Sequence, residues 1–192
     1  MSPALAPGFA DPVLEAQRCF RALLEAMSRP GRVQTVATAL EPPPPLGRAA
    51  SAVLLTLADA DTPVWTDAGA EAADWLRFHA GCPLVSAPEQ AGFLLASTAP
   101  PPLASLQAWT EEEPHRSATL ILQVTGLGEG DGWRLTGPGI ESAHRLRAQG
   151  LPAGFLAEWA ANHARFPRGV DVVLCAGDRL AALPRTTRIE EA

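Results

Sequence analysis

Five arginines stand in short turns, each near a stiff proline or a flexible glycine, and they could bind an anion. They are Arg29, Arg32, Arg168, Arg185 and Arg188. A guanidinium is a planar fork of five N–H donors that matches a phosphate or carboxylate group, so a converging set would form an anion-binding site. The alternative is open, because in a chain with 21 carboxylates these arginines could equally form ion pairs or cap turn carbonyls.

Asn162 and His163 form a second candidate, since they precede Phe166 and Arg168 at a predicted helix-to-strand junction. Such junctions hold ligand sites in α/β folds, although more often at the carboxyl ends of the strands. The alternative is a hydrogen-bonded core histidine, because His163 lies at helical spacing from large apolar residues. We predict no catalytic residue in this chain.

The remaining histidines and the cysteines form no pattern typical of a metal site or a nucleophile. The four histidines make no HxxxH or HExxH pair, so no metal site is predicted. Cys175 ends an apolar strand, where a buried and inert thiol is expected. Cys82 follows a helix C-terminus, whose dipole raises the pKa of a thiol. The glycine-rich segment 126–132 is interpreted as a hairpin turn, because a strand and not a helix is expected after it.

Composition excludes several function classes. All 15 basic residues are arginine, so no lysine can form a Schiff base with pyridoxal phosphate (PLP) or serve a nucleotide-binding P-loop. The net charge of −6 argues against binding to nucleic acid or to an anionic membrane surface. Three widely spaced cysteines are no disulfide framework, which fits a cytoplasmic protein.

The elements that must position these residues alternate between helices and strands, which is typical of an α/β fold with a mixed sheet. We expect one domain over residues 1–192. Helices are predicted over 12–27, 49–57, 70–79 and 152–164, and strands over 33–36, 64–65, 93–96, 117–124, 133–136 and 170–175.

Three of these elements carry specific expectations. In the first helix, Asp11 is the N-cap. One face is predicted to carry, at helical spacing, Val13, Ala16, Phe20, Leu24 and Met27. The strand over 133–136 should pair with the strand over 117–124 through the glycine-rich turn. The last helix should begin with Pro152 at its first position.

Several segments together resemble the PhnH family, the H subunits of the carbon–phosphorus lyase system of phosphonate-using bacteria. The most specific are the turn MSRPG and the segments NHARFPRGVD and LPRTTRI. Further matches are LLTLADADTPVW, WLRFHAGCP, HRSATLILQV and LTGPGI, and together they cover most of the chain in family order.

The resemblance implies a three-layer α/β/α sandwich similar to the large domain of PLP-dependent transferases but without the cofactor, which agrees with the absence of lysine. It also implies a homodimer that joins the G, I and J subunits in a core complex. That complex replaces adenine at C1 of ATP by a phosphonate, and the resemblance assigns no catalytic residue to this subunit. The expected function is an accessory subunit, with ATP or phosphonate at a shared site. The alternative is a stand-alone anion- or nucleotide-binding protein.

Overall fold

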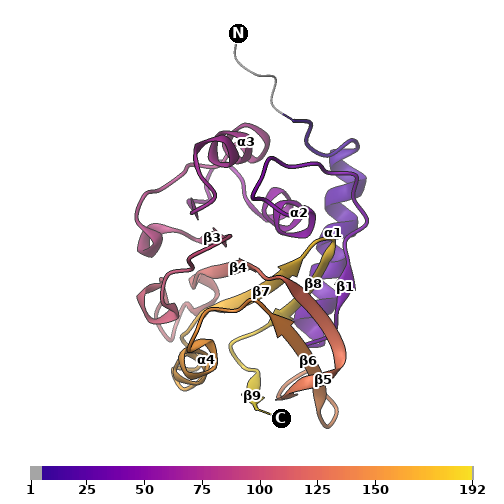
Figure 1. Ribbon diagram of the computed structural model, residues 1–192. Helices are drawn as coiled ribbons and strands as arrows, with labels where there is room; N and C mark the ends of the chain where they lie inside the picture. Colours follow the sequence, from indigo (N-terminus) through magenta and orange to yellow (C-terminus); the bar gives the residue numbers. More distant parts are fainter. Residues whose placement is uncertain (1–5, 192) are drawn as a thin grey trace.

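Short runs of aliphatic residues form a six-stranded sheet in the computed structural model, which describes residues 6–191 (Figure 1). The strand order is β1 (Gln34–Thr35), β8 (Arg179–Leu183), β7 (Asp171–Ala176), β4 (Thr119–Gln123), β3 (Phe93–Ala96) and β2 (Val64–Thr66). Strands β7, β4, β3 and β2 are parallel, whereas β8 runs antiparallel to both of its neighbours. The predicted α/β class with a mixed sheet is therefore confirmed. Residues 1–5 and 192 of the predicted domain lie outside the described residues.

Helices cover one face of this sheet. Successive side chains of a strand point to opposite faces, so Ile121 of β4 enters one core and Leu120 enters another. The core around Ile121 is closed by three helices, α1 (Pro12–Ser28), α2 (Arg48–Leu57) and α3 (Ala70–Ala80). Figure 1 shows them together on one side of the sheet.

The other face is covered by a mixed layer, which differs from the all-helical layer expected of an α/β/α sandwich. It contains helix α4 (Phe155–His163) and a three-stranded sheet ordered β6 (His144–Gln149), β5 (Gly126–Thr136), β9 (Arg188–Glu190). This layer packs against the sheet through the core around Leu120, to which it contributes Leu135, Leu146 and Trp159. Three short 3₁₀ helices lie in the connections, η1 (Pro88–Gln90), η2 (Leu103–Ser105) and η3 (Pro114–Arg116).

Helix α1 is confirmed, but its strongest apolar stripe does not face the core. The carboxylate of Asp11 caps the helix by accepting a hydrogen bond from the N–H of Leu14 at 3.0 Å. Val13, Phe20 and Leu24 are 77%, 49% and 57% exposed. The buried face instead carries Glu15, Cys19, Leu23 and Ala26. Leu23 is the one large apolar residue on this face, and Val13, Phe20 and Leu24 point outward.

The predicted pairing of 133–136 with 117–124 is wrong. Strand β4 already has β3 and β7 as neighbours, so both of its edges are occupied. Segment 126–132 is part of the long strand β5, with an irregularity between Glu129 and Trp133, and is not a simple turn. β5 pairs with β6 and β9 in the small sheet, because those are the free edges available to it.

Helix α4 begins three residues later than predicted. Pro152 is not at its first position, because Gly154 takes a left-handed conformation with φ +81° and separates the proline from the helix. The helix ends at His163, one residue before the predicted end. His163 therefore lies in the last turn of α4, and the chain returns to the sheet at Asp171.

Candidate functional site

A loop over residues 137–140 brings several of the segments singled out in the sequence to one end of the molecule. Gly139 has φ +83°, and a Cβ there would overlap the carbonyl oxygen of Ser28 and lie 3.1 Å from Cδ of Pro30. On the other side, a Cβ on Gly137 would lie 2.9 Å from the carbonyl oxygen of Thr186. The turn after α1 and the segment before β9 thus pack against opposite sides of one glycine-rich loop.

Arg29 and Arg32 line a cavity of about 290 Å³ on one side of this loop, together with Glu141 and His144. Nε of Arg29 lies 3.1 Å from Oε1 of Glu25 in an exposed pair on the same helix. Exposed pairs of this kind contribute little free energy, so the pair leaves Arg29 able to exchange partners. The cavity combines two arginines with a carboxylate and an imidazole.

His144 lines this cavity and contacts Glu129, a pair that the sequence does not single out. Nε2 of His144 is buried and lies 3.2 Å from Oε2 of Glu129, without a well-aligned hydrogen bond to any described residue. Oε1 of Glu129 accepts a hydrogen bond from the N–H of Val33 at 2.8 Å. The two residues meet only through the pairing of β5 with β6, which no local pattern predicts.

Arg188 and His163 line a second cavity, of about 490 Å³, with Thr186, Phe166 and the loop residue Pro138. Nδ1 of His163 lies 2.9 Å from the carbonyl oxygen of Arg185. A carbonyl only accepts, so Nδ1 carries the proton. Nε2 of the same ring accepts a hydrogen bond from Nε of Arg188 at 3.3 Å. The structure therefore brings the predicted residues His163 and Arg188 into direct contact.

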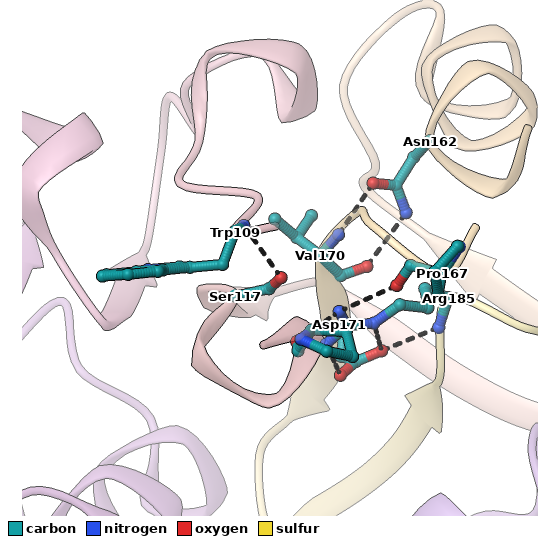
Figure 2. A network of polar contacts seen from close by, with 8 residues as sticks. Trp109, Ser117, Asn162, Pro167, Val170, Asp171 and Arg185 are labelled. Carbon is teal, nitrogen blue, oxygen red and sulfur yellow. Dashed lines mark hydrogen bonds and ion pairs between the residues drawn. The ribbon is translucent and has the colours of Figure 1, made fainter. Parts of the chain in front are cut away.

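Arg185 has a different environment, since its guanidinium is occupied by the protein itself (Figure 2). Its Nη2 lies 2.7 Å from Oδ2 of Asp171 and its Nε lies 3.1 Å from Oδ1. Nη1 donates to the carbonyl oxygen of Pro114 at 2.8 Å. The two side chains of the ion pair are only 12% and 16% exposed. Arg185 therefore connects β7, the segment after β8 and the 3₁₀ helix η3.

Asn162 also has its polar atoms occupied (Figure 2). Its amide nitrogen donates to the carbonyl oxygen of Val170 at 2.9 Å, and its amide oxygen accepts from the N–H of Val170 at 2.8 Å. The residue is buried, so it positions the chain entering β7. Arg168, which lies between Asn162 and Val170 in the sequence, is exposed. Of the predicted residues, the structure thus groups Arg29 with Arg32 and His163 with Arg188.

The opposite edge of the sheet, at the carboxyl ends of the parallel strands, carries side chains that bind the backbone. The carboxylate of Asp67 accepts from the N–H groups of Ser97, Thr98 and Ala99 at 2.7–2.9 Å. Burial acts against the charged form of Asp67, but these hydrogen bonds outweigh it and lower the pKa of the carboxyl. Gln123 similarly donates to Pro45 and Ser97. The two arginine cavities lie away from this edge.

Cys175 is buried as expected, and burial, more than a helix dipole, raises the pKa of Cys82. Cys19, Cys82 and Cys175 are free and buried, and burial raises the pKa of all three thiols. Within residues 6–191, His, Cys, Asp and Glu form no group of three or more that could hold a metal ion. In the same residues, no helix combines the length and the apolar character needed to cross a membrane.

Comparisons with known proteins find one family that matches nearly the whole chain. The family model described as bacterial phosphonate metabolism protein (PhnH) matches residues 7–190. A Rhizobium meliloti (strain 1021) protein named alpha-D-ribose 1-methylphosphonate 5-triphosphate synthase subunit PhnH is 42% identical over 187 residues, 95% of this chain and 94% of that protein. A Stutzerimonas stutzeri protein named putative C-P lyase subunit protein HtxG is 38% identical over 178 residues, 90% of this chain and 85% of that protein. The chain therefore belongs to the PhnH family of bacterial phosphonate metabolism proteins.

Proposed function

We propose that this chain is an accessory, non-catalytic subunit of a carbon–phosphorus lyase core complex. The complex would transfer a phosphonate to C1 of the ribose of ATP with loss of adenine. The observation that carries this proposal is the 42% identity, over 95% of the chain, to a protein named as a subunit of a ribose 1-methylphosphonate 5-triphosphate synthase. The partners would be the G, I and J subunits, and a homodimer of this chain would join them.

The arrangement of the predicted site residues supports an accessory role. Two of the seven, Arg185 and Asn162, bind and position the protein's own chain. Two others, Arg29 and Arg32, line a cavity that also contains a carboxylate. We propose that the arginines left at the surface bind anionic groups at a site shared with the partner subunits.

We also propose that the fold of this chain is similar to that of the large domain of PLP-dependent transferases. The residues present do not fit the cofactor, because the chain has no lysine to form its aldimine. We also place the subunit in the cytoplasm, which the three free cysteines support. Its charge of −6 speaks against nucleic acid and anionic membranes as partners.

The test is co-expression of a tagged copy of this chain with its G, I and J counterparts, followed by native mass spectrometry of the purified material. We expect one assembly that contains all four subunits. A control purification with the tag on an unrelated protein measures nonspecific capture. Recovery of this chain as a lone homodimer, with the other subunits present in excess, would contradict the proposal.

The second candidate is a stand-alone anion- or nucleotide-binding protein. The cavity lined by Arg188 and His163 favours it, because its lining combines a guanidinium and an imidazole with no carboxylate. That candidate predicts a lone dimer that binds an anionic ligand without help from other subunits. The same mass-spectrometry experiment separates the two, since only the accessory subunit enters a larger assembly.

A further inference from the structure

We propose that the cavity lined by Arg188, His163 and Thr186 is a binding site for a phosphoryl or phosphonyl group that carries an apolar substituent. Arg188 would hold the anion and His163 would hold Arg188 in place. This inference rests on the proposed function for the type of anion, and on the geometry of this chain alone for the site.

The hydrogen bonds of Arg188 leave its anion-binding end free. Its Nε donates to Nε2 of His163, and the protonated Nδ1 of that ring is held by the carbonyl oxygen of Arg185. The imidazole is fixed at both nitrogens, so it sets the direction of the Arg188 side chain. Among residues 6–191, Nη1 and Nη2 of Arg188 have no hydrogen-bond or ion-pair partner. These two nitrogens are the pair that grips two oxygens of one anion.

The side chains that line this cavity carry positive charge without a balancing negative charge, which favours binding of an anion. The cavity lining contains Arg188 and His163 but no carboxylate. Glu190 lies two residues further along β9, on the same side of the strand, and its Oε2 is 2.8 Å from Nη1 of Arg134. Asp171 is occupied by Arg185 in the same way. Glu190 and Asp171, one on the same strand as Arg188 and one paired with Arg185, therefore already have cationic partners.

The remaining walls define the rest of the ligand. Thr136 and Thr186 line the cavity, and their hydroxyl groups are additional donors for a tetrahedral oxyanion. Phe166 and Pro138 supply an apolar wall, and Phe166 is 59% exposed and so accessible to a ligand. A bare inorganic anion would leave this wall without a contact. The site therefore fits an organic phosphate or phosphonate better than inorganic phosphate.

The direct test is a titration of the full isolated chain, because all the residues assigned to the site belong to it. Phenylphosphonate and phenyl phosphate serve as probes, with inorganic phosphate and benzyl alcohol as the anionic and the apolar halves. We expect saturable binding of both organic probes by calorimetry, and binding at least tenfold weaker for either half. Equal affinity for inorganic phosphate would overturn the organic part of the proposal, and absence of saturable binding would overturn the site.

Two arginine variants test the residue assignment. Arg188→Ala should weaken phenylphosphonate binding at least tenfold, and Arg188→Lys should restore only part of it, because a lysine keeps the charge and loses the fork. Arg179→Ala is the matched control, since Arg179 is also exposed but begins β8 at the opposite edge of the sheet. Thermal melting shows whether each variant is folded. Equal losses in Arg188→Ala and Arg179→Ala would contradict the assignment.

The positioning role of His163 needs a measurement that a general structural role would not change. In the ¹H–¹⁵N spectrum, the Nε–H signal of Arg188 should be protected from exchange in the wild type and lost in His163→Ala, with the backbone signals of β4 and β7 unchanged. An unprotected Nε–H signal in the wild type would contradict the role. Titration and assembly give separate results, so a complex that forms without probe binding refutes only this site, and binding without a complex refutes only the proposed function.

Discussion

The guanidinium of Arg185 and the carboxylate of Asp171 meet at two points, with Nη2 2.7 Å from Oδ2 and Nε 3.1 Å from Oδ1. Asp171 is the first residue of β7, and Arg185 follows the end of β8, the antiparallel neighbour of β7. The backbone N–H of Arg185 also donates to Oδ1, at 2.7 Å. The arginine that the sequence offered as an anion ligand is therefore bound by an anion of the same chain.

Removing the carboxylate should show this structural role. Asp171→Ala leaves a mostly buried guanidinium without its partner, and we expect a loss of about 3–5 kcal/mol in the free energy of unfolding. Asp74→Ala is the control, because Asp74 forms an exposed pair with Arg77 and should lose at most about 1 kcal/mol. Urea unfolding measures both. Similar small losses in the two variants would contradict the structural role.

The close packing of the 137–140 loop predicts a difference between two glycines. Gly139→Ala should destabilise the fold strongly, because a Cβ there would overlap the carbonyl oxygen of Ser28. Gly130→Ala is the control, since Gly130 also has positive φ but a Cβ there meets nothing within 4 Å. Its cost should be the conformational one alone, about 1–2 kcal/mol. Thermal and urea unfolding should separate the two variants, and equal costs would show that the loop is not tightly packed.

The orientation of α1 predicts that two adjacent leucines differ strongly in their contribution to the free energy of unfolding. Leu23 is 7% exposed and packs in the core, so Leu23→Ala should lose about 2–5 kcal/mol. Leu24 is 57% exposed, so Leu24→Ala should change stability by no more than about 0.5 kcal/mol. The two substitutions are chemically identical and lie on the same helix. A larger loss at Leu24, measured by urea unfolding, would mean that the outward stripe is covered in the folded state.

The hydrogen-bonded carboxylate of Asp67 should make the free energy of unfolding depend on pH in the acid range. Hydrogen bonds from Ser97, Thr98 and Ala99 lower the pKa of its carboxyl in the folded state, despite the opposing effect of burial. As the pH falls, the unfolded chain binds the proton first, so the stabilisation is complete above the unfolded pKa and disappears as the pH falls through the lower folded pKa. Unfolding free energies of wild type and Asp67→Asn should therefore differ most at neutral pH and converge in acid.

Asp61→Asn controls for the general effect of losing one carboxylate, because Asp61 is exposed. The difference between wild type and Asp61→Asn should stay small over the same range of pH. If the difference for Asp67→Asn did not shrink in acid, the carboxylate of Asp67 would not be the source of the pH dependence.

Local sequence signals were sufficient for the elements whose boundaries depend on nearby residues. Asp11 caps α1, Gly81 ends α3 in a left-handed conformation, and the apolar run before Cys175 forms a central strand. The two helix ends depend on contacts within a few residues of the chain, and the strand is recognisable from its run of apolar residues. The arginine turns were also recognisable as a group, because their proline and glycine neighbours are adjacent in sequence.

The partners of strands and arginines depended on contacts between distant parts of the chain. Strand β5 joined β6 and β9 because β4 had no free edge, and a local pattern carries no information about edge occupancy. Asp171 and Arg185 are separated by a hairpin, and Arg188 reaches His163 across 25 residues. Local pattern therefore predicted which residues could bind an anion. Folding determined which of them the protein uses for its own structure, because an ion pair or hydrogen bond forms only between groups that the chain brings within about 3 Å.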